Sequence, residues 1–165
     1  MKNLNQYIQE KLIINKDYND GKMYHPKSFD ELRKIIEDRY DKLGAGTKRN
    51  PIDFNDIDVS NLDSFCNDND KGIFEGTKFK YIDISEWDVS NVTNMTRMFC
   101  WCKELESIGD ISKWDVSKVN SMIHMFFDCK KFNQDISNWD VSNVMGRVGM
   151  FYGCPIKNEY KPKFK

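Results

Sequence analysis

The chain has 165 residues, with 39% hydrophobic, 13% aromatic and 31% charged side chains, and a formal net charge of −1. This length and apolar content suit one folded domain, and they exclude a disordered polyampholyte, a fibre and a membrane-spanning helix of about 20 apolar residues. The charge is segregated: residues 51–154 sum to −7 (10 basic, 17 acidic), residues 1–50 to +3 (11 basic, 8 acidic) and residues 155–165 to +3 (4 basic, 1 acidic), so nucleic acid is not expected to bind the middle of the chain directly.

The first segment, residues 1–26, contains a short amphipathic pattern made by Leu4, Tyr7, Ile8, Lys11 and Leu12. This pattern favours a capping or docking helix. The alternative is a leader, since the segment resembles the N-terminal part of many phage-encoded proteins. It lacks the apolar run and cleavage site of a secretory signal, so we expect a cytoplasmic protein, in the host cytoplasm if the chain is phage-encoded.

A capping box marks the next element. Ser28 can cap a helix while Glu31, three residues later, reaches back to the start of that helix. An apolar stripe follows at helical spacing, and Gly44 suits the position just after a helix. The stripe consists of Leu32, Ile35, Ile36, Tyr40 and Leu43. We therefore predict an amphipathic helix over residues 29–43 and an N-terminal helical cap over residues 1–50.

The strongest signal is an internal repeat. Residues 84–92, 111–119 and 136–144 share the pattern Ile-Ser-x-Trp-Asp-Val-Ser-x-Val, and each continues to a Met-Phe pair and then a Cys. Corresponding positions are 27 and then 25 residues apart, and a degenerate earlier copy begins at residues 56–62. One degenerate and three clear repeats are therefore expected over residues 51–155, followed by a basic, solvated tail at 156–165.

Each repeat predicts a short strand, a turn and a short helix. Trp and Val lie two apart, which places both on one face of a strand. After a Ser suited to a helix N-cap, apolar residues recur at helical spacing. In the first clear repeat they are Val92, Met95, Met98 and Phe99. One unit cannot bury these side chains alone, whereas stacked copies can.

The motif Trp-Asp-Val-Ser-Asn-Val-Thr-Asn-Met-x-x-Met-Phe-x-x-Cys, with a later Phe-Asn-Gln-Asp-Ile-Ser, resembles the bacterial surface-protein repeat of about 25 residues, which is related to BspA-type leucine-rich repeats. The resemblance covers residues 52–155. It implies an α/β fold, a right-handed leucine-rich-repeat-like solenoid with a short parallel sheet, which the N-terminal helix would cap. It also implies a protein-interaction or surface module.

Two rows of aspartates recur with the repeat. One row follows the tryptophans, at Asp58, Asp88, Asp115 and Asp140, and the other precedes the Ile-Ser pairs, at Asp83, Asp110 and Asp135. Stacked strands about 4.8 Å apart would turn each row into an acidic strip for a basic partner or Ca²⁺. The alternative, which we favour, is that each carboxylate accepts a backbone N–H in a tight turn.

Cysteine and tryptophan also form rows. The odd number of cysteines, five, predicts free thiols in a reducing compartment, and their spacing does not fit a zinc site, so we expect neither a metal nor another cofactor. We expect small buried filler at Cys102, Cys129 and Cys154, and an exposed thiol at Cys100. We expect core packing, rather than a stacking platform, at Trp87, Trp114 and Trp139.

Recognition is expected at positions that vary between repeats. One such column comprises Glu86, Lys113 and Asn138, and another comprises Asn91, Lys118 and Asn143. An aromatic and cationic set typical of interface anchors comprises Arg97, Trp101, Phe127 and Tyr152. The first column and the aromatic set are the predicted protein-binding residues.

No nucleophile elbow, phosphate loop or His-nucleophile pair is visible, so we expect no enzymatic activity. The sequence favours a non-enzymatic module that presents a rigid surface to a protein partner, with nucleic acid involved only through a bound protein. One alternative is a phage-encoded or mobile-element inhibitor of a host defence enzyme such as a nuclease. Another is a metal-dependent hydrolase that uses the acidic ladder.

Overall fold

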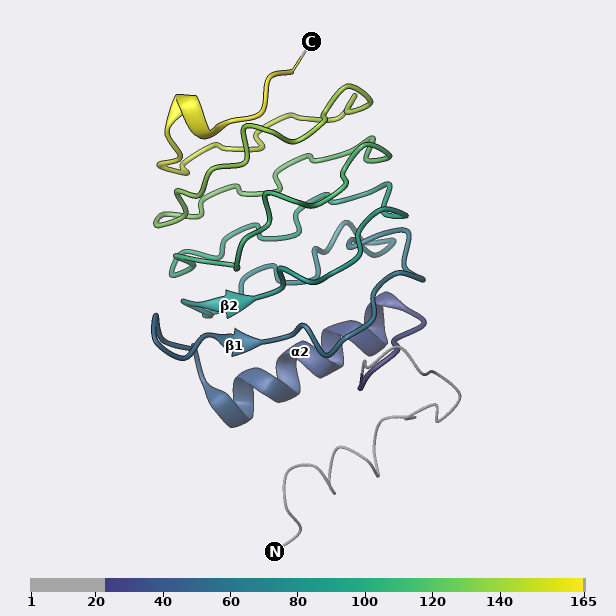
Figure 1. Ribbon diagram of the computed structural model, residues 1–165, viewed down its shortest axis with the longest axis vertical. Helices are drawn as coiled ribbons and strands as arrows, with labels where there is room; N and C mark the ends of the chain where they lie inside the picture. The colour runs from purple at the N-terminus through teal and green to yellow at the C-terminus, as the bar shows by residue number, and fades with distance from the viewer. Residues whose placement is uncertain (1–22, 165) are drawn as a thin grey trace, which may run out of the picture.

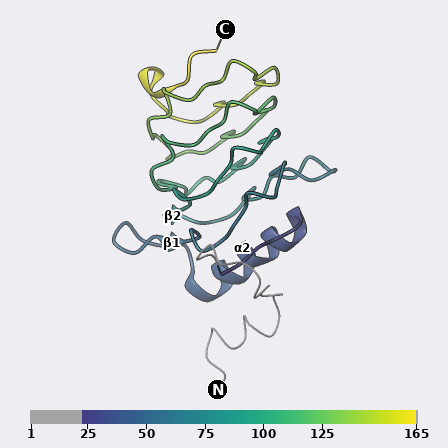
Figure 2. The ribbon, with the colours of Figure 1, turned by 45° about the vertical axis from the view of Figure 1, so that its right-hand side comes forward.

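The computed structural model describes residues 23–164 of the chain. In chain order these residues form α2 (Phe29–Leu43), the two-residue strands β1 (Ile52–Asp53) and β2 (Ile82–Asp83), and the 3-10 helix η1 (Asn158–Tyr160). From β1 onward, successive turns of chain lie one above another, and α2 lies across the N-terminal end of the stack (Figures 1 and 2). The expected helix within residues 1–26 falls largely outside the described residues.

The predicted α/β fold, a right-handed leucine-rich-repeat-like solenoid, is wrong. Within residues 23–164 there is one α-helix, α2, and the one sheet consists of β1 and β2. These strands pair in parallel, with Ile52 opposite Ile82 and Asp53 opposite Asp83. The strand-turn-helix unit expected in each repeat does not form, because turns occupy the stretches that were expected to be helical.

Each of those stretches is a run of three overlapping tight turns. In the first clear repeat the Met98 N–H donates to the Met95 carbonyl at 3.2 Å, the Cys100 N–H to the Arg97 carbonyl at 3.0 Å and the Cys102 N–H to the Phe99 carbonyl at 3.1 Å. The third residues of the first and last of these turns have a positive φ, 55° at Arg97 and 59° at Trp101. A positive φ at this position is typical of a type II turn, and it is incompatible with a right-handed helix. The later repeats have positive φ at the equivalent positions, His124, Asp128, Gly149 and Gly153.

The other backbone groups of these turns explain why no helix forms. Alternate N–H groups donate to carbonyls of the following turn rather than to carbonyls four residues back. The donor and acceptor pairs from the first to the second clear repeat are Met95 to Ser121, Arg97 to Ile123, Phe99 to Met125 and Trp101 to Phe127, at 2.8–2.9 Å. Those from the second to the third are Met122 to Gly146, His124 to Val148, Phe126 to Met150 and Asp128 to Tyr152, at 2.7–3.0 Å.

Apolar side chains fill the space between the turns. A column of phenylalanine rings runs through the stack, with centroid distances of 5.3 Å from Phe74 to Phe99, 5.4 Å from Phe99 to Phe126 and 5.9 Å from Phe126 to Phe151. The tryptophans of the repeat motif are buried, as the sequence predicts; they are Trp87, Trp114 and Trp139. Burying such large rings removes much apolar surface from water and stabilises the stack.

The indole N–H groups of that row are not equivalent. Trp87 Nε1 donates to the Phe54 carbonyl at 2.9 Å, and Trp139 Nε1 donates to the Ile111 carbonyl at 3.0 Å. Trp114 Nε1 is buried and has no partner among residues 23–164. An unsatisfied buried donor costs about 1–3 kcal/mol.

The predicted helix over residues 29–43 is confirmed as α2. The Ser28 hydroxyl accepts the Glu31 N–H at 3.3 Å, and Gly44, with φ 73°, ends the helix by donating its N–H to the Tyr40 carbonyl. Leu32, Ile35 and Ile36 are buried against the stack as expected. Leu43 is not, since it is 53% exposed.

α2 also provides a hydrogen-bond donor for backbone carbonyls in the first turn of the stack. The Arg33 guanidinium Nη1 donates to the Ile73 carbonyl at 2.6 Å and reaches the carbonyls of Gly72 and Glu75 at 3.4 Å. α2 lies at the N-terminal end of the stack (Figure 2). A side chain of the helix therefore takes the place of a preceding turn.

The C-terminal segment differs from the solvated tail that the sequence predicts. Ile156 and Pro162 are buried, and the Tyr160 carbonyl at the end of η1 accepts the Ile136 N–H at 3.0 Å. The segment therefore covers part of the last repeat. Among the described residues, no helix has both the length and the apolar character needed to cross a membrane.

Candidate functional site

Three aromatic side chains from successive turns line one edge of the stack. We call Trp101, Phe127 and Tyr152 the aromatic strip. The ring centroids are 6.4 Å apart between Trp101 and Phe127, in an edge-to-face arrangement, and 5.0 Å apart between Phe127 and Tyr152, which stack. Trp101 is 47% exposed and Tyr152 is 68% exposed. The structure thus brings together the aromatic set that the sequence proposes.

The backbone explains how these rings come to lie together. The Trp101 N–H donates to the Phe127 carbonyl, and the Asp128 N–H donates to the Tyr152 carbonyl, so the inter-turn hydrogen bonds hold the three residues side by side. Trp101 belongs to a different column of the repeat from the other two. In that column it aligns with Gly76, Asp128 and Gly153, all of which have positive φ.

Two basic side chains border the aromatic strip. The Arg97 guanidinium carbon lies 5.8 Å from the Trp101 ring centroid, and its Nη1 lies 3.5 Å from a carboxylate oxygen of Glu75. The His124 ring lies 5.1 Å from the Phe127 ring, edge to face. Sequence reasoning included Arg97 but missed His124. The signal was available, because the two residues occupy the same position of the repeat and share a positive φ, 55° and 54°.

The other predicted binding column does not join the aromatic strip. Glu86, Lys113 and Asn138 are all exposed, and within residues 23–164 no hydrogen bond, ion pair or ring contact links them to it. Asn138 instead forms a hydrogen bond between turns, in which its Nδ2 donates to the Ser112 carbonyl of the previous turn at 2.6 Å. Two members of the second variable column act in the same way, since Asn91 donates to the Ser60 carbonyl and Asn143 to the Ser117 carbonyl.

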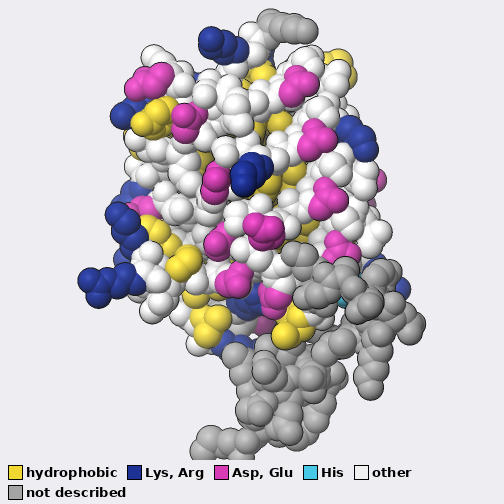
Figure 3. Space-filling model, viewed as in Figure 1, with side chains coloured by type: hydrophobic (Ala, Val, Ile, Leu, Met, Phe, Trp, Pro, Cys, Tyr) yellow, Lys and Arg dark blue, Asp and Glu magenta, His cyan; other side chains and the backbone are white. Residues whose placement is uncertain are grey.

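Both aspartate rows are engaged in turns, as the favoured interpretation predicts. In the row that follows the tryptophans, each Asp accepts the N–H of the Ser two residues later, at 2.9–3.0 Å. In the other row each Asp does the same, at 2.9–3.1 Å. Hydrogen bonding by the Ser117 side chain, and then by its backbone, lowers the pKa of Asp115. Asp and Glu side chains are spread over the face of the molecule that Figure 3 shows.

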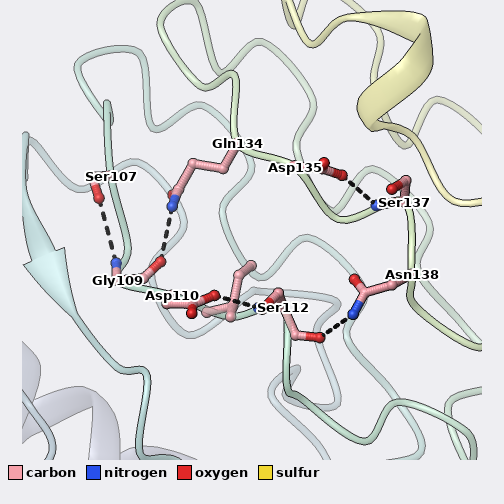
Figure 4. Close-up of a pocket in the computed structure, with 9 residues that line it drawn as sticks. Ser107, Gly109, Asp110, Ser112, Gln134, Asp135, Ser137 and Asn138 are labelled. Atoms are coloured by element: carbon pink, nitrogen blue, oxygen red, sulfur yellow. Dashed lines mark hydrogen bonds between the residues drawn. The ribbon is translucent and has the colours of Figure 1, made fainter.

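A shallow cleft of about 640 Å³ lies between two successive turns of the stack. Figure 4 shows how polar side chains of the later turn reach across it: Gln134 donates to the Gly109 carbonyl at 2.8 Å, and Asn138 donates to the Ser112 carbonyl. Its two aspartates, Asp110 and Asp135, each accept a serine N–H. Gln134 and Asn138 therefore join one turn to the next, whereas the two aspartates bond within their own turns.

Four of the five cysteines are buried, and Cys154, expected as buried filler, is half-buried. Cys102 and Cys129 donate to the carbonyls of Phe74 and Phe99, at 3.0 and 2.9 Å, which fits the predicted role of filler. The expected exposed thiol at Cys100 is wrong, because this side chain is 1% exposed and burial raises its pKa to about 11. Within residues 23–164 no group of three or more His, Cys, Asp or Glu side chains converges in a way that could hold a metal ion.

Comparisons with known proteins place the chain by family alone. Neither the curated proteins nor the solved structures contain a match to it. One family model matches residues 50–163, which span the repeats and most of the C-terminal segment. The chain belongs to the family described as Mycoplasma protein of unknown function, DUF285.

Proposed function

We propose that this protein is a non-enzymatic binding module that holds a protein partner on the aromatic strip. The observation that carries this proposal is the backbone of Trp101, whose φ is 59°. A bulky residue at positive φ is strained, by roughly 1–2 kcal/mol, and the equivalent positions are Gly76, Asp128 and Gly153. Packing does not explain the tryptophan, because its ring is half exposed. Strain that the fold does not need is typical of a functional position.

The setting of the aromatic strip supports a role in binding. Tryptophan, tyrosine and arginine are the residues that contribute most often to interface hot spots. The inter-turn hydrogen bonds hold the strip in place, so little ordering would be needed when a partner binds. A module of this kind is also consistent with the resemblance of the repeat motif to BspA-type surface repeats.

The other functions that the sequence suggested have less support. A hydrolase acting through the acidic ladder would need carboxylates available to a metal or a substrate, and those of both rows accept serine N–H groups instead. An inhibitor of a host defence enzyme would be one special case of a protein-binding module. Nothing among residues 23–164 favours such an enzyme over another protein partner.

Trp101→Gly tests the proposal, because it removes the ring and the strain together. We expect the unfolding free energy of the purified protein to rise by about 1 kcal/mol in urea denaturation. In parallel affinity capture from the native cell, followed by mass spectrometry, we expect the partner to be lost from Trp101→Gly and retained by Lys113→Ser. Retention of every wild-type partner by Trp101→Gly, with the fold intact, would disprove the proposal.

A further inference from the structure

The last turn of the stack has unused backbone donors. Its internal hydrogen bonds match those of the earlier turns, with Met150 donating to Arg147, Tyr152 to Gly149 and Cys154 to Phe151. In the earlier turns the alternate N–H groups donate to the next turn. The equivalent N–H groups here belong to Gly149, Phe151 and Gly153, and none of them has a partner among residues 23–164.

One carbonyl at the same edge is also unused. The Thr93 carbonyl accepts the Asn120 N–H at 2.8 Å, and the Asn120 carbonyl accepts the Met145 N–H at 2.9 Å. Met145 is the next residue in this series, and its carbonyl accepts nothing within residues 23–164. We call residues 145–153 the open edge. It offers one acceptor followed by donors at alternate residues, which is the pattern that an added parallel chain would match.

A second copy of the protein does not fit the open edge. Two copies related by a two-fold axis would place the N–H groups of Gly149, Phe151 and Gly153 against identical N–H groups, leaving them unpaired. Head-to-tail stacking would need the free carbonyls of another copy's first turn. Those of Gly72, Ile73 and Glu75 are covered by α2 and occupied by Arg33. The occupant must therefore be a different chain.

Charge indicates which kind of chain it is. The repeats carry −7, whereas residues 155–165 carry four lysines and one glutamate. The Lys161 ammonium lies 5.7 Å from the Phe151 ring, within the open edge. An acidic segment would be repelled by the sides of the stack and attracted to its C-terminal end. Exposed apolar side chains flank the donors, namely Met145, Val148 and Tyr152.

We infer that the open edge binds an extended acidic segment of a partner protein, which adds to the stack as one further parallel strand. Its carbonyls accept the N–H groups of Gly149, Phe151 and Gly153, and one or two of its N–H groups donate to the Met145 carbonyl. Its carboxylates face Lys161 of the C-terminal segment. This inference goes beyond the proposed function, because the bonds are made by backbone rather than by the side chains of the aromatic strip.

Amide hydrogen exchange of the whole protein, followed by NMR, tests the inference. In the free protein we expect the amides of Gly149, Phe151 and Gly153 to exchange more than about 100-fold faster than their equivalents Arg97, Phe99 and Trp101. A nine-residue peptide of alternating Asp and Val, the length of the open edge, should slow these three amides and shift their resonances. A peptide of alternating Lys and Val serves as the control and should do neither.

Variants separate the open edge from the aromatic strip. Lys161→Glu should weaken binding of the Asp-Val peptide by about fivefold or more, whereas Lys113→Glu, on the side of the stack, should change it less than about twofold. Trp101→Gly should leave peptide binding unchanged even if it abolishes capture of the partner. Slow exchange of the three amides in the free protein, failure of the Asp-Val peptide to shift them, or equal binding of the Lys-Val peptide would overturn the inference.

Discussion

Tryptophan occurs in two settings in this protein. Trp87, Trp114 and Trp139 recur at one position of the repeat and are buried between turns. Trp101 occurs once, in a column where its counterparts are Gly76, Asp128 and Gly153, and half of its surface faces solvent. The first three are accounted for by packing. The fourth costs backbone strain and gains little burial.

The difference shows how a repeat can separate structural from functional residues. A residue type that recurs in register is explained by what every turn needs, such as a ring in the core or an acceptor in a turn. Another explanation is needed for a residue that differs in type from its counterparts in the other repeats. The need is greater when its backbone conformation is one that those counterparts tolerate better. Trp101 satisfies both conditions, and this is why it carries the functional proposal.

The largest expected effect separates the two settings directly. Trp114→Ala should lower the unfolding free energy by about 3 kcal/mol or more, because it leaves a cavity where a 6% exposed ring was packed against Trp139. Trp101→Ala should change it by less than about 1 kcal/mol. Urea denaturation of the two variants measures both values. An unchanged midpoint for Trp114→Ala would mean that the ring contributes no packing, and the distinction between the two settings would fail.

A smaller effect resolves members of the buried row. Phenylalanine keeps a ring but removes the indole N–H. This N–H is bonded to the Ile111 carbonyl in Trp139, whereas in Trp114 it has no partner within the described part of the chain. Trp139→Phe should therefore cost about 1 kcal/mol more than Trp114→Phe, since only the former loses a hydrogen bond and leaves a buried carbonyl with one partner fewer. The same denaturation experiment measures the difference. Equal costs would show that the indole bond of Trp139 contributes nothing.

The smallest expected effect is a pH dependence of the stability, which arises from aspartates of the repeat motif. Hydrogen bonds with Ser117 and Ser137 lower the pKa values of Asp115 and Asp135. The unfolded state therefore binds protons more readily than the folded state, and stability is fully present above the unfolded pKa of about 4. It should be lost gradually as the pH falls below that value. The urea midpoint should thus decrease between pH 5 and pH 3.

Asp115→Asn is the matched control for this pH dependence, because the amide oxygen can still accept the Ser117 N–H but does not titrate in this range. The decrease in midpoint between pH 5 and pH 3 should be smaller in this variant than in the wild type. An identical decrease in both would show that the carboxylate of Asp115 does not contribute.

The sequence was most informative where one local rule decided the outcome. Ser28 and Gly44 marked the ends of α2, and the alternation of Trp and Val placed Trp87, Trp114 and Trp139 in the core. The aspartate rows were correctly interpreted as turn acceptors, because a carboxylate two residues before a serine N–H makes the same local bond in every copy.

The sequence misled where two local patterns share one spacing. Val92, Met95, Met98 and Phe99 recur as they would along a helix, but two successive four-residue turns place apolar residues at nearly the same intervals. The deciding information was the positive φ of the third residue in each turn, which Gly149 and Gly153 indicated in the last copy. The equivalent positions in the first copy also have positive φ, but they hold Arg97 and Trp101. Neither residue type favours that conformation, so the sequence gives no sign of it there.

The candidate site was only partly predictable for a related reason. The repeat register identified Trp101, Phe127 and Tyr152 as irregular or variable, but only the inter-turn hydrogen bonds show that they touch. The column of Glu86, Lys113 and Asn138 varies just as much and does not join them. Variation between copies reveals which positions the fold does not require, whereas contact depends on the geometry of the turns.

The pairing of each turn with both of its neighbours affects how such a chain can evolve. Each turn between α2 and the C-terminal segment exchanges backbone hydrogen bonds with the turn before it and with the turn after it. A duplicated copy inserted whole would find partners on both sides, and neither terminus of the stack would need to change. Loss of a few residues inside one copy would instead shift every later donor away from its acceptor. Natural length variants should therefore differ by whole copies of about 25 residues.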